Sequence, residues 1–176
     1  MLTQILFIVI GLLTMLFEST ALHAFEIAGV IPNLTLILIF SCGFVKGPVF
    51  GRRLGLVLGL MLDILFSKVI GFYGLLYFLL GHFSGVLAGV VDTGQLYVPA
   101  LAVFGFDFAL GLISWFFLRL LAGGGNFTYY LTGTILPEAV YTTIVMVPLY
   151  LLHRFVLLLL ERFTTEAADG KEAAQG

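Results

Sequence analysis

Residues Gly47–Asp63 read GPVFGRRLGLVLGLMLD, and small or acidic residues recur in this stretch at every fourth position. These positions are Gly47, Gly51, Gly55, Gly59 and Asp63. Residues four apart lie one above the other on a helix, so they form a groove without side chains that ends in a carboxylate. Such a groove lets two membrane helices approach backbone to backbone. The stretch predicts a closely packed helix, which we interpret as the spine of the fold.

The composition indicates the environment of this helix. The chain has 176 residues, of which 61% are hydrophobic and only 10% are charged, and its mean hydropathy is +1.15. Soluble domains are about 45–50% apolar and about 25% charged. We therefore expect an all-α integral membrane protein, a bundle of six transmembrane helices at ~20 residues each. The net charge of −2 offers no basic surface to nucleic acid.

Apolar runs and helix-breaking residues place the six expected spans. They are residues 2–22, 33–45, 50–67, 72–91, 97–121 and 134–160, which make up one transmembrane domain over residues 1–160. The polar residues 161–176 are expected to form a disordered cytoplasmic tail. Pro32 suits the first turn of the second helix, and Pro148 predicts a kink in the sixth. The first span lacks the basic start of a cleavable signal peptide, so we interpret it as retained.

A second file of small residues lies in the fourth expected span. Gly81, Gly85 and Gly89 are again four residues apart, which makes this helix the expected partner of the glycine file in the third span.

Basic residues predict the orientation of the chain. With six spans and an inside N-terminus, the inside collects Lys46, Arg52, Arg53, Arg154, Arg162 and Lys171, whereas the outside keeps only Lys68 and Arg119. Cytoplasmic loops of membrane proteins carry such an excess of Lys and Arg. Both termini are therefore expected in the cytoplasm.

Several polar residues fall inside the expected spans. An ionisable residue at mid-bilayer costs at least about 2.5 kcal/mol, so each is a functional hypothesis. Three interpretations are open: these residues hold helices in register by pairing or by reaching interfacial water, they line a polar cavity open to the outside, or they catalyse a reaction. The predicted topology puts His82 and Asp107 near mid-membrane, and the outer half holds Glu18, Asp63, Arg119 and Glu138.

Catalysis has the weakest support of the three interpretations. An intramembrane aspartyl protease would need Gly-x-Gly-Asp, but Phe106 stands where the second glycine would precede Asp107. Neither Gly-x-Ser-x-Gly nor His-Glu-x-x-His occurs, and the histidines are scattered without metal-ligand spacing. We expect no enzyme, no cofactor and no metal site.

Three stretches carry a resemblance to a known family. The first is Pro32-Asn33-Leu34, which opens a short helix. The second is the glycine file ending at Asp63, followed eight residues later by Gly71. The third contains Pro137, Glu138 and Tyr141, with Pro148 further along. Together with the length and the six spans, they resemble the rod shape-determining protein MreD.

The resemblance implies a non-enzymatic subunit of the bacterial inner membrane that supports rod shape and lateral peptidoglycan synthesis. Members of that family bind the coiled-coil protein MreC and work alongside MreB, RodZ, and RodA with its transpeptidase. The aromatic residues Phe104, Phe108 and Trp115 are our candidate surface for a partner's helix, although a lipid-facing stripe explains them equally well. The first, second, fifth and sixth spans are expected to offer lateral surface. Whether the chain forms a homodimer stays open.

The alternative is a solute-binding membrane subunit of a vitamin-type transporter. The MreD family is similar in architecture to the six-helix substrate-binding subunits of energy-coupling-factor transporters. Those subunits usually carry small residues on the first span, where they dock their energising partner. Here the first span has only Gly11 among large neighbours, which favours the elongation subunit.

Overall fold

The computed structural model describes residues 2–20, 26–27, 29–67, 69–91, 96–120 and 126–173. Helices dominate these residues, in the order α1 (Leu2–Thr20), α2 (Leu34–Lys46), α3 (Pro48–Phe66), α4 (Phe72–Ala88), α5 (Tyr97–Ser114), α6 (Phe127–Tyr130) and α7 (Leu136–Ala173). The π-helical segments Trp115–Leu120 and Leu131–Ile135 extend α5 and join α6 to α7. The described part contains no β-strand, and its one isolated bridge joins Ile27 to Val30. The expected all-helical fold is confirmed.

The antiparallel helices α3 and α4 make the most extensive contact in this part of the chain. Glycines bring their backbones together, because a Cβ atom at Gly59 would lie 2.7 Å from the Cα atom of Gly74. A Cβ atom at Gly51 would overlap the carbonyl group of Gly81, and one at Gly55 would overlap that of Tyr77. The contact expected between the third and fourth spans is therefore present.

The glycine file on α4 agrees with the predicted one at Gly81 and Gly85 and differs from it at Gly89. Gly85 packs on the turn before α3, where its Cβ atom would lie 2.5 Å from the Cα atom of Pro48. Gly89 takes no part, since a Cβ atom there would meet only Val86 of its own turn, at 3.4 Å. The third glycine of α4 in the contact is Gly74, near the start of the helix. The two helices run in opposite directions, so the start of α4 lies beside Gly59 and Asp63 at the end of α3.

Helix α2 occupies the centre of the molecule. Every residue from Thr35 to Phe44 is buried, and α1, α3, α4, α5 and α7 all contact the helix. A Cβ atom at Gly43 would lie 2.7 Å from the carbonyl oxygen of Gly81 and 3.4 Å from the Cα atom of Gly51, so three helices cross there. The expectation that the second span offers lateral surface to a partner is wrong, because its neighbours cover it.

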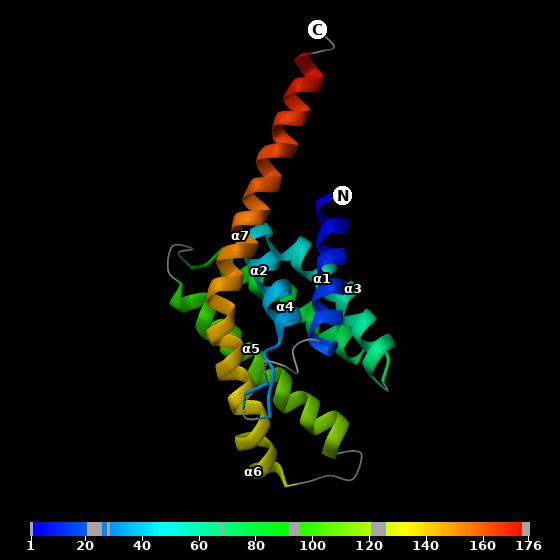
Figure 1. Cartoon of the computed structure of the whole chain (residues 1–176), viewed down its shortest axis with the longest axis vertical. Coiled ribbons are helices and arrows are strands. Elements are labelled where there is room, and N and C mark those ends of the chain that lie inside the picture. Colours follow the sequence, from blue (N-terminus) through cyan, green and yellow to red (C-terminus); the bar gives the residue numbers. More distant parts are fainter. Residues whose placement is uncertain are drawn as a thin grey trace.

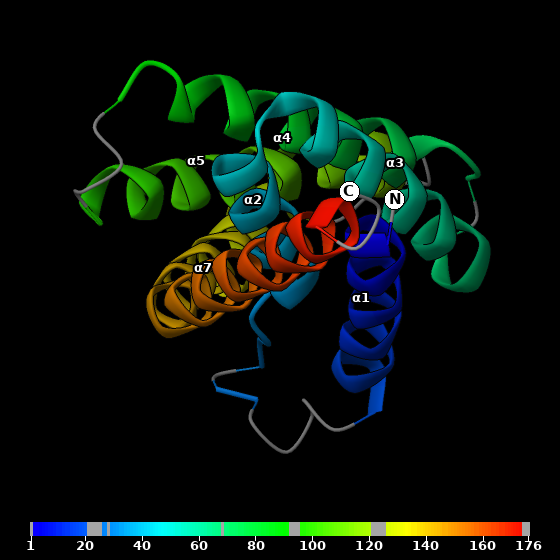
Figure 2. The same ribbon diagram turned by 90° about the horizontal axis from the view of Figure 1, so that it is seen from above.

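Helices α5 and α7 form a second pair, which reaches the rest mainly through the contact of α7 with α2. On α5 the buried residues are Pro99, Val103 and Asp107, a narrow stripe with a spacing of four. Viewed from above, α5 and α7 lie on one side of α2, and α1 and α3 lie on the other (Figure 2). The start of α1 and the end of α7 lie at the same end of the molecule (Figure 1).

The helix ends agree with the first five expected spans to within a few residues. The sixth differs, because the chain is helical from Phe127 and α7 continues to Ala173. That continuation includes residues 161–173, for which the sequence analysis expects disorder. Alanine and glutamate are strong helix formers, which accounts for the difference. The expected turn at residues 92–95 and loop at residues 123–125 lie outside the described residues.

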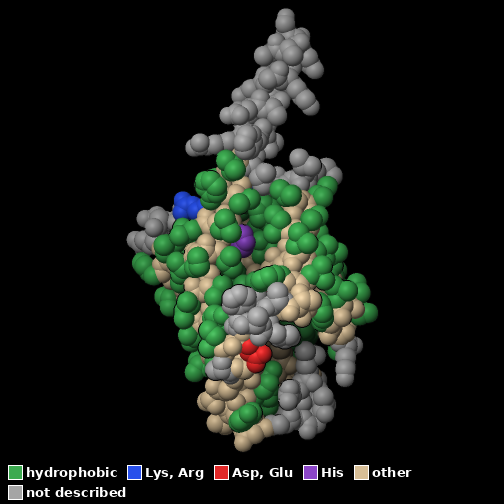
Figure 3. All heavy atoms as spheres, viewed as in Figure 1, with side chains coloured by type: hydrophobic (Ala, Val, Ile, Leu, Met, Phe, Trp, Pro, Cys, Tyr) green, Lys and Arg blue, Asp and Glu red, His purple; other side chains and the backbone are tan. Residues whose placement is uncertain are grey.

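Two helical stretches, Tyr97–Phe117 and Phe127–Leu159, are long and apolar enough to cross a membrane. Only 11% and 22% of their most apolar windows are buried, unlike the core helix of a soluble protein. Large hydrophobic side chains are also exposed on α1, α3 and α4. Figure 3 shows that hydrophobic side chains cover a large part of one face of the molecule. These features indicate association with a membrane.

Candidate functional site

Asn33 connects four helices at the start of α2. As the N-cap residue it accepts a hydrogen bond from the backbone N–H of Leu36 at 2.9 Å, and the Tyr77 hydroxyl of α4 donates to the same oxygen at 3.2 Å. The side-chain amide of Asn33 donates to Asp107 Oδ1 of α5 at 3.3 Å. Its backbone N–H donates to Thr142 Oγ1 of α7 at 3.1 Å. This residue therefore ties both helix pairs to the central helix.

Glu18, in the last turn of α1, completes the cap of α2. Its carboxylate accepts from the backbone N–H of Thr35 at 2.9 Å and from the Thr35 hydroxyl at 2.6 Å. The first N–H groups of a helix have no partner within the helix, and the helix dipole favours negative charge there. The Glu18 carboxylate thus accepts from the Thr35 N–H group and places negative charge at the positive end of the α2 dipole.

Asp63 does the same for α4, and is fully buried. Its Oδ2 atom accepts from the backbone N–H groups of Gly71 and Gly74, both at 2.9 Å, and Oδ1 accepts from that of Tyr73 at 3.0 Å. Gly71 has φ +94°, a conformation that glycine adopts without steric cost. These hydrogen bonds connect α3 to the start of α4, in agreement with the interpretation that polar residues hold the helices in register.

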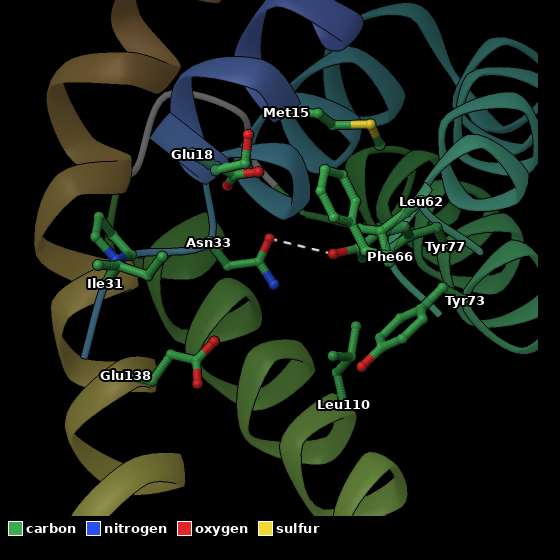
Figure 4. Close-up of a pocket in the computed structure, with 12 residues that line it drawn as sticks. Met15, Glu18, Ile31, Asn33, Leu62, Phe66, Tyr73, Tyr77, Leu110 and Glu138 are labelled. Carbon is green, nitrogen blue, oxygen red and sulfur yellow. Dashed lines mark hydrogen bonds between the residues drawn. The ribbon is translucent and has the colours of Figure 1, made fainter. Parts of the chain in front are cut away.

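A cavity of about 310 Å³ opens between the helices beside these caps. Figure 4 shows Asn33, Glu18 and Glu138 around it, with the ring of Tyr73 on the opposite side. The residues that line it are Met15, Glu18, Ser19, Ile31, Pro32, Asn33, Leu62, Phe66, Tyr73, Tyr77, Leu110 and Glu138. Glu18 and Glu138, which the predicted topology puts in the same half of the bundle, thus line one cavity.

Two carboxyl groups here have unused hydrogen-bonding capacity. Asp107 is 4% exposed, and its Oδ2 atom has no hydrogen-bond partner among the described residues. Glu138 makes no hydrogen bond or ion pair within the same residues. The carboxyl groups of Asp107 and Glu18 repel its negative charge. Asp107 and Asp63 have different partners, so the hydrogen bonds do not link the two into an aspartyl dyad.

The remaining polar candidates lie elsewhere. The ring of His82 packs on Phe83 at 5.6 Å, and its buried Nδ1 atom finds no partner among the described residues. Arg119 belongs to the π-helical end of α5, and its side chain is outside the described part. No group of three or more His, Cys, Asp or Glu residues in the described part could hold a metal ion.

The prolines of the three stretches lie in different places, and only Pro32 lines the cavity. Pro137, in the first turn of α7, and Tyr141 line a separate apolar hollow with Val30. Pro148 lies inside α7, where the sequence predicts a kink, and faces outward.

The candidate partner surface divides into two parts. Phe104 and Phe108 stack on each other with ring centroids 6.1 Å apart and planes 9° apart, and both are half-buried. Trp115 packs on Phe127, with centroids 4.7 Å apart. The three residues therefore do not form one continuous aromatic contact.

The sequence analysis did not identify Tyr73, Tyr77 or Thr142 as members of the site. No local pattern marks them, because each reaches Asn33 or the cavity from another helix. Asn33 itself could have been found as a helix cap, since an asparagine directly before an apolar helix is a start signal.

No protein-family model matches this chain, and no curated protein or solved structure matches it either.

Proposed function

We propose that this chain is a non-enzymatic, MreD-like subunit of the bacterial cell-elongation machinery, a multi-pass inner-membrane protein that binds an MreC-type coiled-coil protein. One observation carries the proposal: the stretches that bear the resemblance come together at one end of the fold. The backbone N–H of Asn33, in the first stretch, donates to Thr142, which follows Tyr141 of the third. Leu62, next to Asp63 of the second stretch, lines the same cavity as Asn33 and Glu138. The resemblance thus rests on residues that act together.

Charges support the proposed orientation, with six spans and both termini in the cytoplasm. The rings of Phe44 and Tyr150 lie 5.9 Å apart, so the basic residues Lys46 and Arg154, which follow them on α2 and α7, belong to the same end of the bundle. The carboxylates described above gather near the opposite end of α2. Basic residues on the cytoplasmic side are the rule for membrane proteins.

The proposal is tested by depletion and by co-purification. Loss of the chain should turn rod-shaped cells of its host into spheres, because wall synthesis is no longer organised along the cell body. A pull-down in detergent should recover a single-span protein with a periplasmic coiled coil. A depleted strain that stays rod-shaped would overturn the proposal.

The aromatic residues of α5 are the proposed contact with that partner. Replacing Phe104, Phe108 and Trp115 by Leu keeps the surface apolar but removes the ring shape on which aromatic contacts depend. We expect reduced co-purification of the partner, with unchanged membrane levels of the variant. Undiminished co-purification would eliminate this surface.

A solute-binding subunit remains the second candidate, and the cavity beside Asn33 is the observation that favours it. Its volume of about 310 Å³ is at the lower limit of ligand sites, roughly 300–1,000 Å³. Mass spectrometry of the same pull-down separates the two functions. A stoichiometric small molecule with an energising transporter module would favour this candidate, and a coiled-coil protein would favour the first.

A further inference from the structure

The ionisable groups that line the cavity beside Asn33 include two carboxyl groups and no cationic side chain among the described residues. The cavity holds the carboxyl groups of Glu18 and Glu138, and a third, on Asp107, lies next to it through the hydrogen bond from Asn33. No Lys or Arg is among the described residues that line the cavity. Like charges that share a site of low dielectric repel each other strongly. The negative charge of the cavity is therefore not balanced by the described lining.

The protein's own hydrogen bonds use only part of this acceptor capacity. Glu18 is engaged by Thr35, whereas Glu138 has no hydrogen bond within the described residues and the buried Oδ2 atom of Asp107 is also without one there. A buried carboxylate that lacks a partner is costly. A positively charged ligand in the cavity would supply a partner for Glu138, the carboxyl group of the lining that has none among the described residues.

The other walls suit the rest of such a ligand. Tyr73 and Tyr77 also border the cavity, and Figure 4 shows the hydroxyl ends of both directed toward it. A tyrosine hydroxyl oxygen accepts hydrogen bonds from a donor such as an ammonium group. Met15, Leu62 and Leu110 supply apolar surface. The lining thus joins a place for a cation to a place for a hydrocarbon group.

We infer that this cavity binds an organic ammonium ion, a positively charged amine carried on an apolar body. The amine is placed among Glu138, Glu18 and the hydroxyl groups of the two tyrosines, and the apolar body lies against Met15 and the leucines. The inference rests on neither proposed function, because it requires no partner protein and no transport.

Charge selectivity of binding tests the inference. The purified full-length protein in detergent is titrated with phenethylamine, 2-phenylethanol and phenylacetate, which share a ring and differ in charge, while its thermal unfolding is followed. Phenethylamine should reach half-saturation at a concentration at least tenfold lower than the alcohol, and phenylacetate should not bind. The same titration with hexylamine and hexanol tests whether the ring matters. Equal binding of both amines and their alcohols would overturn the inference, since it would mean carboxyl groups held neutral in an apolar cavity.

Matched variants connect this selectivity to the cavity. Glu138→Gln keeps the shape of the side chain and removes its charge, so the preference for phenethylamine over the alcohol should fall at least tenfold. Glu26→Gln removes the same charge from an exposed residue outside the lining and should change nothing. Because amines also enter micelles, the difference between the two variants measures binding to the protein. A preference that persists in Glu138→Gln would overturn the assignment.

Ammonium groups reach a membrane protein both as free amines and as lipid headgroups. The titration is repeated in nanodiscs of phosphatidylethanolamine and of phosphatidylglycerol. A lipid source predicts that phosphatidylethanolamine competes and weakens phenethylamine binding, whereas a soluble amine predicts equal binding in both discs. Absence of binding in both discs would overturn the inference, and the cell-shape and co-purification experiments would be unaffected.

Discussion

The crossing of α2, α3 and α4 and the pair of α5 and α7 are held together in different ways. In the crossing, Gly43, Gly51 and Gly81 bring three backbones into contact, and the central helix is covered. In the pair, α5 buries a narrow stripe, and most of its long apolar surface stays exposed. Close backbone contact requires glycine at fixed positions, whereas packing of large side chains tolerates many residues. Substitutions should therefore be severe in the first region and mild in the second.

The largest expected effect is that of bulk inside the crossing. Gly55→Leu would force a branched side chain into the carbonyl group of Tyr77, so we expect loss of folded, monodisperse protein. Size-exclusion chromatography after detergent extraction measures this. Gly105→Leu on α5 is the matched control, because nothing lies within 4 Å of a Cβ atom there, and it should behave as the unaltered protein. Equal losses for both variants would remove the distinction between the regions.

The next effect concerns the cap of α4. Asp63→Leu removes the acceptor of three N–H groups, and the loss at the buried Gly74 alone costs about 1–3 kcal/mol. Asp63→Asn keeps one oxygen and should lose an intermediate amount of thermal stability. Asp107→Asn, in the other region, affects hydrogen bonds with the side chains of Asn33 and Thr142, one fewer than Asp63 accepts, and should lose less than Asp63→Asn. The melting temperatures of the purified variants check this order. A lower melting temperature for Asp107→Asn than for the Asp63 variants would contradict it.

A smaller effect is expected where the two regions join. Tyr77→Phe removes the hydroxyl that bonds Asn33 from α4, and Thr142→Val removes the acceptor on α7, each worth about 0.5–1.5 kcal/mol. Thr142→Val should cost more, because it leaves the Asn33 N–H group without a partner. Combining the two should show whether they act through Asn33 together, as a non-additive loss in the melting temperature.

The smallest effect tests the tolerant region alone. Gly105→Ala adds a methyl group in open space on α5 and replaces a poor helix former, so it should be neutral or stabilise by up to about 1 kcal/mol. Gly59→Ala is the counterpart in the crossing, where the methyl group would meet Gly74 at 2.7 Å, and should destabilise. If both substitutions shifted the melting temperature in the same direction, the proposed difference in tolerance between the two regions would be contradicted.

The sequence predicts the crossing better than the rest because its signal is local. Gly51, Gly55 and Gly59 are four residues apart. This spacing indicates that they share one helix face and that another helix packs closely on that face. The burial of α2 could not be predicted in this way, because a short apolar helix has the same composition whether it faces lipid or protein. Gly43 stands alone in α2, without a periodic partner, and so gave no signal.

The site was predictable in part. Depth along the predicted spans brings Glu18 and Glu138 to the same half of the bundle, and both line the cavity. The pairings themselves depend on how helices distant in sequence rotate against each other. That is why the contacts of Asn33 with Tyr77 and Thr142 emerge only from the structure.

The shortness of α2 has a consequence for how the protein is made. Its 13 residues extend about 20 Å, whereas the hydrocarbon core of a bilayer is about 30 Å thick. In the proposed topology, the first N–H groups of α2 therefore lie below the membrane surface, where Glu18 and Asn33 accept hydrogen bonds from them. Thr142, which accepts from Asn33, is synthesised more than a hundred residues later. In the proposed topology this hydrogen bond can thus form only after the sixth span has entered the membrane, so the start of α2 gains its contact with α7 late in synthesis.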